Sequence, residues 1–199
     1  MALSSNPEKN GREGELMRAF MLSGAIGAAL LAAGAAFSQG ATPDTTVTRV
    51  KLPADYAKSF RLYDTVDKAE RKIVRFLYVN RDALANVSAD APFPNGTVIV
   101  MEDREVALDT AGKPIVDAAG RLQPTGRVKG IAVMAKELMW GDTNAFPSDK
   151  DNGDWEYAAF KADGSPNPVK LDTCYACHLP QKGLDFTFSG KKIHEAAKK

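Results

Sequence analysis

Both cysteines of this 199-residue chain lie within five consecutive residues, Cys174-Tyr175-Ala176-Cys177-His178, together with one of its two histidines. Cys-x-x-Cys-His is the attachment signature of a c-type haem. On one short helical turn, the two thiols reach the two vinyl groups of one porphyrin edge, and the next residue lies beneath the iron. The motif therefore predicts one covalently attached haem c, with thioethers at Cys174 and Cys177 and with His178 as the proximal iron ligand.

Three other uses of the two cysteines remain open. A thioredoxin-like Cys-x-x-Cys begins a helix inside a βαβ pattern, whereas this motif lies near the C-terminus without such a pattern. A structural zinc site usually draws on two ligand pairs, and beyond the motif the chain has only His194 and no further cysteine. A disulfide between Cys174 and Cys177 would be strained. A haem, in contrast, uses all three side chains of the motif at once.

The N-terminal 40 residues have the layout of an export signal. Three basic residues precede an apolar run rich in Ala and Gly, residues 20–37, and small residues follow it. We predict a signal peptide over residues 1–40 and a single domain over residues 41–199. The expected location is the periplasm, where c-type haem is attached, with no membrane contact after cleavage. An uncleaved anchor is the alternative, because the run is about long enough to span a bilayer.

The charge balance narrows the possible partners. The chain has 26 basic and 25 acidic residues, a formal net charge of +1, and a hydrophobic fraction of 44%. A nucleic-acid surface needs clustered Lys and Arg, so no nucleic-acid partner is expected. The length and the apolar content suffice for one globular domain with its own core.

Strand patterns dominate the domain. Segments rich in β-formers or alternating in polarity cover residues 72–80, 96–106, 126–138 and 154–161. Alternation places Met101 on the same strand face as Ile99, and it places Phe76 on the same face as Tyr78.

Helices and turns fill the remainder. Helices are expected within residues 54–64, 81–87 and 190–199. A near-repeat, residues 109–116 and 117–124, carries Ala-Gly and a basic residue at equivalent places and is expected to form turns of an exposed excursion. The predicted fold class is α+β, a compact antiparallel β-sheet with short helices, with the Cys-x-x-Cys-His motif on a C-terminal helix.

Three segments together resemble the cytochrome P460 family, which includes the related β-sheet cytochromes c′. They are FPNGTVIVMED (93–103), GDWEYAAF (153–160) and CYACHLPQKGLDFTFS (174–189). The resemblance covers about residues 52–189. It implies a compact antiparallel sheet with helices, one c-type haem held as described above, and a homodimer.

The family implies two chemistries. Its cytochromes P460 oxidise hydroxylamine and carry a lysine joined covalently to the porphyrin, whereas its cytochromes c′ lack that link and bind nitric oxide in an apolar distal pocket. The cross-linking lysine is expected on a strand resembling Gly-Thr-x-x-Val-Lys, and Met101 stands at that position here. A thioether cannot form the nitrogen–carbon bond, which argues against hydroxylamine oxidation. Lys129 and Lys136 are substitute candidates on the next strand.

The distal side of the haem offers further candidates, none of which we assign as catalytic. Met101 could serve as a sixth iron ligand, or it could pack over the distal face as a polarizable apolar residue. Met134 and Met139 are weaker candidates for the same role, and His194 would need the C-terminal tail to fold back. The other distal-pocket candidates, as pocket caps, proton relays or propionate partners, are Phe76, Tyr78, Arg75, Glu102 and Glu137.

These observations favour an exported mono-haem c-type cytochrome that binds or converts small nitrogen oxides. Nitric oxide is the first expected ligand and hydroxylamine the second, and an enzyme would be an oxidoreductase acting on one of them. The alternative is a periplasmic electron-transfer cytochrome whose sixth position is filled by Met101. A redox partner protein is expected in either case.

Overall fold

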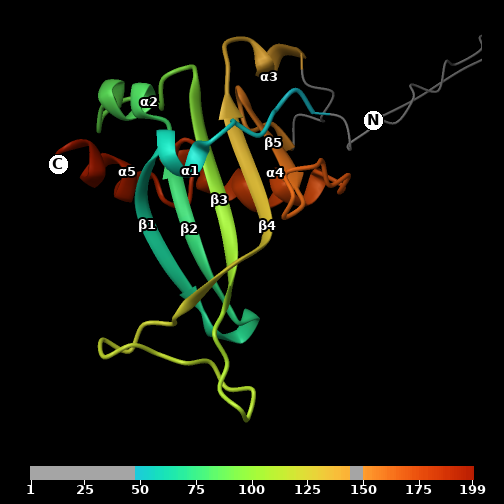
Figure 1. Cartoon of the computed structure of the whole chain (residues 1–199). Helices are drawn as coiled ribbons and strands as arrows, with labels where there is room; N and C mark the ends of the chain where they lie inside the picture. The colour runs from blue at the N-terminus through green and yellow to red at the C-terminus, as the bar shows by residue number, and fades with distance from the viewer. Residues whose placement is uncertain (1–47, 144–149) are drawn as a thin grey trace, which may run out of the picture. The chain divides into compact units, whose positions relative to one another are not determined.

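The computed structural model describes residues 48–143 and 150–199. Its centre is a five-stranded antiparallel sheet in which each strand pairs with the next along the chain (Figure 1). The strands are β1 (Arg61–Lys68), β2 (Ile73–Val79), β3 (Thr97–Val106), β4 (Pro124–Lys136) and β5 (Trp155–Phe160). The predicted α+β class is confirmed, and the predicted signal peptide, residues 1–40, lies outside the described residues.

The first strand was not predicted. The helix expected within residues 54–64 is wrong beyond its first part, because α1 covers only Tyr56–Ser59 and β1 follows at once. β1 lies at the edge of the sheet, its residues are exposed or half-buried, and its register shifts between Leu62 and Asp64. Its strand conformation depends on the backbone hydrogen bonds with β2. This tertiary interaction cannot be predicted from the polar sequence of the segment.

The two faces of the sheet are covered by different parts of the chain. We call "helix face" the side on which Val79, Ile99, Met134 and Tyr157 form a cross-strand row. The C-terminal helices pack there, and Figure 1 shows them in red crossing behind the strands. The opposite face carries the row Tyr78, Val100, Val133 and Ala158, and it packs against Val50 and Tyr56 of the segment that precedes β1.

Several short helices complete the domain. The predicted helices near residues 81–87 and 190–199 are confirmed as α2 (Arg81–Asn86) and α5 (Gly190–Ala197). The remaining described helices are η1 (Ala69–Arg71), α3 (Trp140–Thr143), α4 (Asp172–His178) and η3 (Leu179–Leu184). Ile193 of α5 and Tyr175 of α4 are almost completely buried against the helix face, so these two side chains fasten the C-terminal helices to the sheet. In the part of the chain that the structure describes, no helix combines the length and the apolar character needed to cross a membrane.

The near-repeat forms an excursion between β3 and β4 that extends away from the sheet (Figure 1). In both copies an aspartate closes the turn in the same way. Asp109 Oδ1 accepts hydrogen bonds from the backbone of Ala111 and Lys113, and Asp117 Oδ1 accepts them from the equivalent positions, 119 and 121. Repeated turn chemistry therefore explains the repeated sequence.

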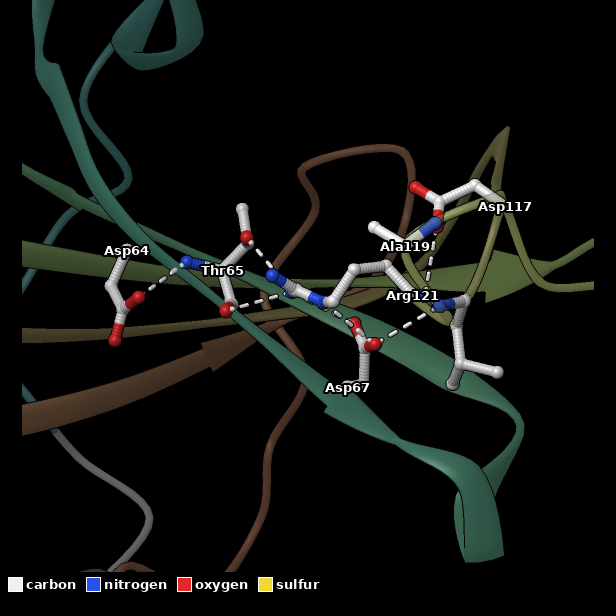
Figure 2. A network of polar contacts seen from close by, with 7 residues as sticks. Asp64, Thr65, Asp67, Asp117, Ala119 and Arg121 are labelled. Atoms are coloured by element: carbon white, nitrogen blue, oxygen red, sulfur yellow. Dashed lines mark hydrogen bonds and ion pairs between the residues drawn. The ribbon is translucent and has the colours of Figure 1, made fainter.

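The excursion is attached to the edge strand by the Arg121 side chain and by the backbone N–H of Leu122, which donates to Asp67 Oδ2 at 3.0 Å. Arg121 donates from Nε to Asp67 Oδ2 at 2.8 Å and from a terminal nitrogen to Asp67 Oδ1 at 3.0 Å, as Figure 2 shows. The same guanidinium group reaches the carbonyl and the hydroxyl oxygen of Thr65, each at 3.2 Å. This paired contact orients the second turn of the excursion against β1.

Candidate functional site

The three side chains of the Cys-x-x-Cys-His motif lie on one side of α4. Residues three and four apart are neighbours on a helix surface, so Cys174, Cys177 and His178 face the same way. Both cysteines are free; Cys174 is half-buried and Cys177 is exposed. Burial raises the pKa of the Cys174 thiol, with the nearby Cys177 adding to the effect. The geometry leaves two thiols and one imidazole available to a single group.

Tyr175, within the motif, anchors α4 to the sheet. Its side chain is 1% exposed, and its ring meets that of Tyr157 edge-on with centroids 4.9 Å apart. The fully buried Asn152 donates from Nδ2 to the hydroxyl oxygen of Tyr157 at 2.7 Å and to the carbonyl oxygen of Tyr175 at 3.2 Å. Sequence reasoning missed Asn152, because an asparagine in a polar loop carries no signal of burial.

His178 is held in one orientation. Its ring contacts those of Tyr157, with centroids 4.7 Å apart, and Phe188, with centroids 4.9 Å apart. Nδ1 is 2.7 Å from the carbonyl oxygen of Phe186, which can only accept, so Nδ1 carries the proton. The lone pair is therefore on Nε2, the nitrogen available to a metal. Burial lowers the pKa of His178 while the Phe186 carbonyl opposes that shift, and the neutral imidazole is favoured.

A row of small and apolar side chains lies next to Tyr157, the residue of the sheet whose ring contacts His178. We call "open row" the four residues directly next to the row of Tyr157 on the helix face: Leu77, Met101, Ala132 and Ala159. Each of them is half-buried, whereas the neighbouring residues Val79, Ile99, Met134 and Tyr157 are buried. The two alanines, paired across β4 and β5, add little side-chain volume to this part of the sheet. An apolar surface near an oriented imidazole and two free thiols fits a haem.

An ion pair borders the open row. Arg75 and Asp103 pair across β2 and β3 with two hydrogen bonds of 2.8 and 3.0 Å, and Arg71 approaches the same carboxylate at 3.6 Å. Arg75, a predicted propionate partner, therefore lies on the helix face with its charge already balanced by Asp103.

Three predicted distal-pocket residues lie on the opposite face. Phe76 and Tyr78 share a face as predicted, but they pack in the cluster that contains Tyr56. The Glu102 carboxylate is buried there and accepts hydrogen bonds from Tyr56 and Arg104. The sheet separates all three side chains from His178, so the structure does not bring them together with the motif.

The remaining candidates are dispersed. Met134 is buried beside Tyr157, its cross-strand partner, whereas Met139 and Glu137 are exposed beyond the end of β4. His194 stacks on the ring of Phe93 with centroids 5.3 Å apart. Of these residues, only Met134 packs next to a residue that contacts His178.

The two lysines considered as substitutes for the cross-linking residue differ in their surroundings. Lys129 is exposed. Lys136 is buried on the helix face, where its Nζ lies 2.8 Å from Asp185 Oδ2 and 5.8 Å from the centre of the Trp155 ring. The Lys136 amine is therefore already engaged by the Asp185 carboxylate, which leaves it less available for a bond to another group.

Comparison with known proteins agrees with this geometry. Residues 53–189 match the family model for Cytochrome P460, which is more than half of the chain. No curated protein matches the sequence. The match confirms the resemblance inferred from the three segments above, and it implies a haem cofactor. The chain belongs to the cytochrome P460 family.

Proposed function

We propose that this protein is an exported cytochrome with one haem c, and that it binds small nitrogen oxides, nitric oxide above all, at an open iron position. The observation that carries the proposal is the open row of Leu77, Met101, Ala132 and Ala159 beside the contact of His178. A haem held by His178 would find apolar surface in this row, next to the Tyr157 ring. A haem iron with one free position supplies diatomic binding and one-electron chemistry when it is bound.

Each residue of the motif has a role in this proposal. Cys174 and Cys177 form the thioethers, and His178 offers Nε2 to the iron while its Nδ1–H stays on the Phe186 carbonyl. The anchor Tyr175 keeps α4 on the sheet, so the three reactive side chains keep one orientation.

The chemistry of the open row favours uncharged diatomic ligands. Leu77, Ala132 and Ala159 offer no side-chain hydrogen bond, and the Met101 sulfur is at most a weak acceptor. Water or an anion placed there would lose hydrogen bonds without replacing them, which is costly in an apolar site. Nitric oxide loses little by the same transfer.

Hydroxylamine oxidation has less support. Met101 occupies the strand position of the expected cross-linking lysine, and the substitute Lys136 is paired with Asp185. Among the described residues of the open row, none is a lysine.

A second candidate is electron transfer with Met101 as the sixth ligand. One observation favours it, because Met101 is only half-buried and so its thioether is not enclosed in the core. With His178 and Met101 both bound to the iron, the haem would be low-spin and would not bind nitric oxide readily.

The location and the partners belong to the same proposal. A periplasmic protein fits the export signal predicted over residues 1–40, because c-type haem is attached on the outer side of the bacterial inner membrane. A homodimer and a redox partner protein are expected from the family.

The visible absorption spectrum tests the proposal most directly. The protein is matured in a periplasm and measured oxidised and reduced, with and without nitric oxide, next to the variant Met101→Leu. We expect a high-spin spectrum that responds to the gas in both proteins. A low-spin parent spectrum that becomes high-spin in Met101→Leu would instead establish the electron-transfer alternative.

A further inference from the structure

The carbonyl group that orients His178 belongs to an unusual stretch of backbone. Asp185 has a φ of 49° and Phe186 has a φ of 58°, so two successive residues other than glycine are left-handed. In this conformation the Cβ of an L-residue crowds the following carbonyl oxygen. A side chain as large as phenylalanine adopts it only when its surroundings hold it there.

The ion pair of Lys136 and Asp185 supplies part of that hold. The Lys136 Nζ lies 2.8 Å from Asp185 Oδ2, and the two side chains are only 9% and 16% exposed. The same carboxylate oxygen accepts a hydrogen bond of 2.8 Å from the backbone N–H of Phe93. Asp185 is therefore tied to the end of β4 and to the loop before β3, two elements that do not belong to the motif.

Burial makes the loss of either partner of this pair costly to stability. Each charge has lost most of its water, so the removal of one partner leaves the other charge unpaired inside the protein. The Phe186 ring, which follows Asp185, is itself 8% exposed and packs in the cluster of the helix face. The ion pair and the ring add to the backbone hydrogen bonds that Asp185 and Phe186 donate to η3, and together they hold the left-handed turn.

We propose that Lys136 and Asp185 are positioning residues that hold the Phe186 carbonyl against His178 and thereby set the electron donation of this imidazole to the iron. The inference rests on the proposed function, because it requires His178 as the iron ligand. An imidazole whose Nδ1–H donates to a carbonyl group is a more basic ligand through Nε2. A more basic ligand stabilises the oxidised iron and lowers the reduction potential.

The test uses two variants of the holoprotein. Lys136→Met removes the charge and keeps most of the length of the side chain. Asp185→Asn keeps an acceptor for the Phe93 N–H, and asparagine tolerates the left-handed conformation well, so this variant disturbs the backbone of the turn least. Lys136→Arg keeps the positive charge and serves as the conservative control.

A second ion pair provides the matched control. Arg121 and Asp67 also join a loop to a strand by a contact of 2.8 Å, but they lie in the excursion and the edge strand, elements without a residue of the motif. Asp67→Asn therefore removes an ion pair of the same length, more exposed to solvent, that has no link to the Phe186 turn. The covalent haem content and the far-ultraviolet circular dichroism of every variant are recorded first.

The main readout is the Fe–His stretching band in the resonance Raman spectrum of the reduced protein. If a sixth ligand is bound, the band is recorded directly after photolysis of the carbon monoxide complex. We expect a shift to lower frequency in Lys136→Met and in Asp185→Asn, with a raised reduction potential in Asp185→Asn. Lys136→Arg and Asp67→Asn keep the parent values.

The outcomes separate the inference from its alternatives. A purely electrostatic effect would move the reduction potential down in Lys136→Met and up in Asp185→Asn, with the Raman band unchanged in both, and would overturn the inference. A Raman band that stays at the parent frequency in both variants would also overturn the inference, but it would leave the proposed function intact. Absence of covalent haem or of an Fe–His band in the parent protein would overturn both.

Discussion

His178 donates its Nδ1–H to the carbonyl oxygen of Phe186, 2.7 Å away and eight residues further along the chain. This hydrogen bond selects the tautomer whose Nε2 lone pair is free, and it stops rotation of the ring beside Tyr157 and Phe188. The motif supplies the imidazole, but the turn that follows η3 supplies its orientation.

Removal of the His178 imidazole tests covalent haem attachment separately from iron ligation. In His178→Gly we expect haem to stay covalently bound through Cys174 and Cys177, while the spectrum loses the proximal ligand. The space left beside Tyr157 and Phe188 should accept free imidazole and restore the parent spectrum. Mass spectrometry of the denatured protein and a titration with imidazole check the two points. A His178→Gly spectrum identical to that of the parent would show that another residue binds the iron.

Adjacent residues of β2 give a test of the two sheet faces. Leu77 lies in the open row, and Phe76 lies on the opposite face in the cluster of Tyr78. We expect Leu77→Phe to weaken nitric oxide binding about tenfold, equivalent to about 1.4 kcal/mol, because the ring would fill the apolar space. Phe76→Leu should leave this affinity unchanged and lower the free energy of unfolding by about 1 kcal/mol.

Both affinities are measured by stopped-flow mixing with nitric oxide. The reverse pattern, with Phe76→Leu affecting the affinity and Leu77→Phe leaving it unchanged, would place the distal pocket on the opposite face of the sheet.

Asn152 should contribute more to stability than an exposed loop asparagine does. Asn152→Ala leaves the hydroxyl of Tyr157 and the carbonyl of Tyr175 without this donor, in a site that is fully buried. We expect a loss of about 1–3 kcal/mol in the free energy of unfolding. Asn86→Ala is the control, because the exposed Asn86 also donates to a carbonyl group, at 2.7 Å, and should change stability by less than about 0.5 kcal/mol. Urea unfolding measures both variants, and equal losses would contradict the role of Asn152.

The contact between Asp67 and Arg121 should make stability depend on pH. The hydrogen bond from Arg121 lowers the pKa of Asp67 in the folded protein (Figure 2). A carboxylate with a depressed folded-state pKa stabilises the fold above its unfolded-state pKa of about 3.9, and the contribution is lost as the pH falls through the folded-state value. Asp67→Asn should therefore lower the free energy of unfolding at pH 7 by about 0.5–1 kcal/mol, since Arg121 is half exposed.

The difference between Asp67→Asn and the parent protein should shrink as the pH is lowered below about 4. Thermal unfolding between pH 3 and pH 7 measures it, with Asp90→Asn as a control at an exposed aspartate outside the excursion and the edge strand. A difference that grows toward low pH would contradict the sign of the effect.

Local patterns predicted most of the elements. Strands β2 to β5 were readable from β-branched and alternating residues, and the repeated Asp-x-Ala-Gly turns were readable from their composition. Strand β1 was missed because an edge strand with exposed and half-buried side chains has little hydrophobic alternation, and its pairing with β2 is made by the backbone. Asn152 and the ion pair of Lys136 with Asp185 were missed because burial of a polar residue arises from segments distant in sequence.

The sequence by itself determined the α+β class, the family and the spacing that puts Cys174, Cys177 and His178 on one side of a helix. It also determined which residues share a strand face, since side chains alternate with a period of two. Only the tertiary structure decided which of the two faces receives the C-terminal helices. Alternation is symmetric between the faces, so it could not separate Met101, which lies in the open row beside the His178 contact, from Phe76, Tyr78 and Glu102 on the other side of the sheet.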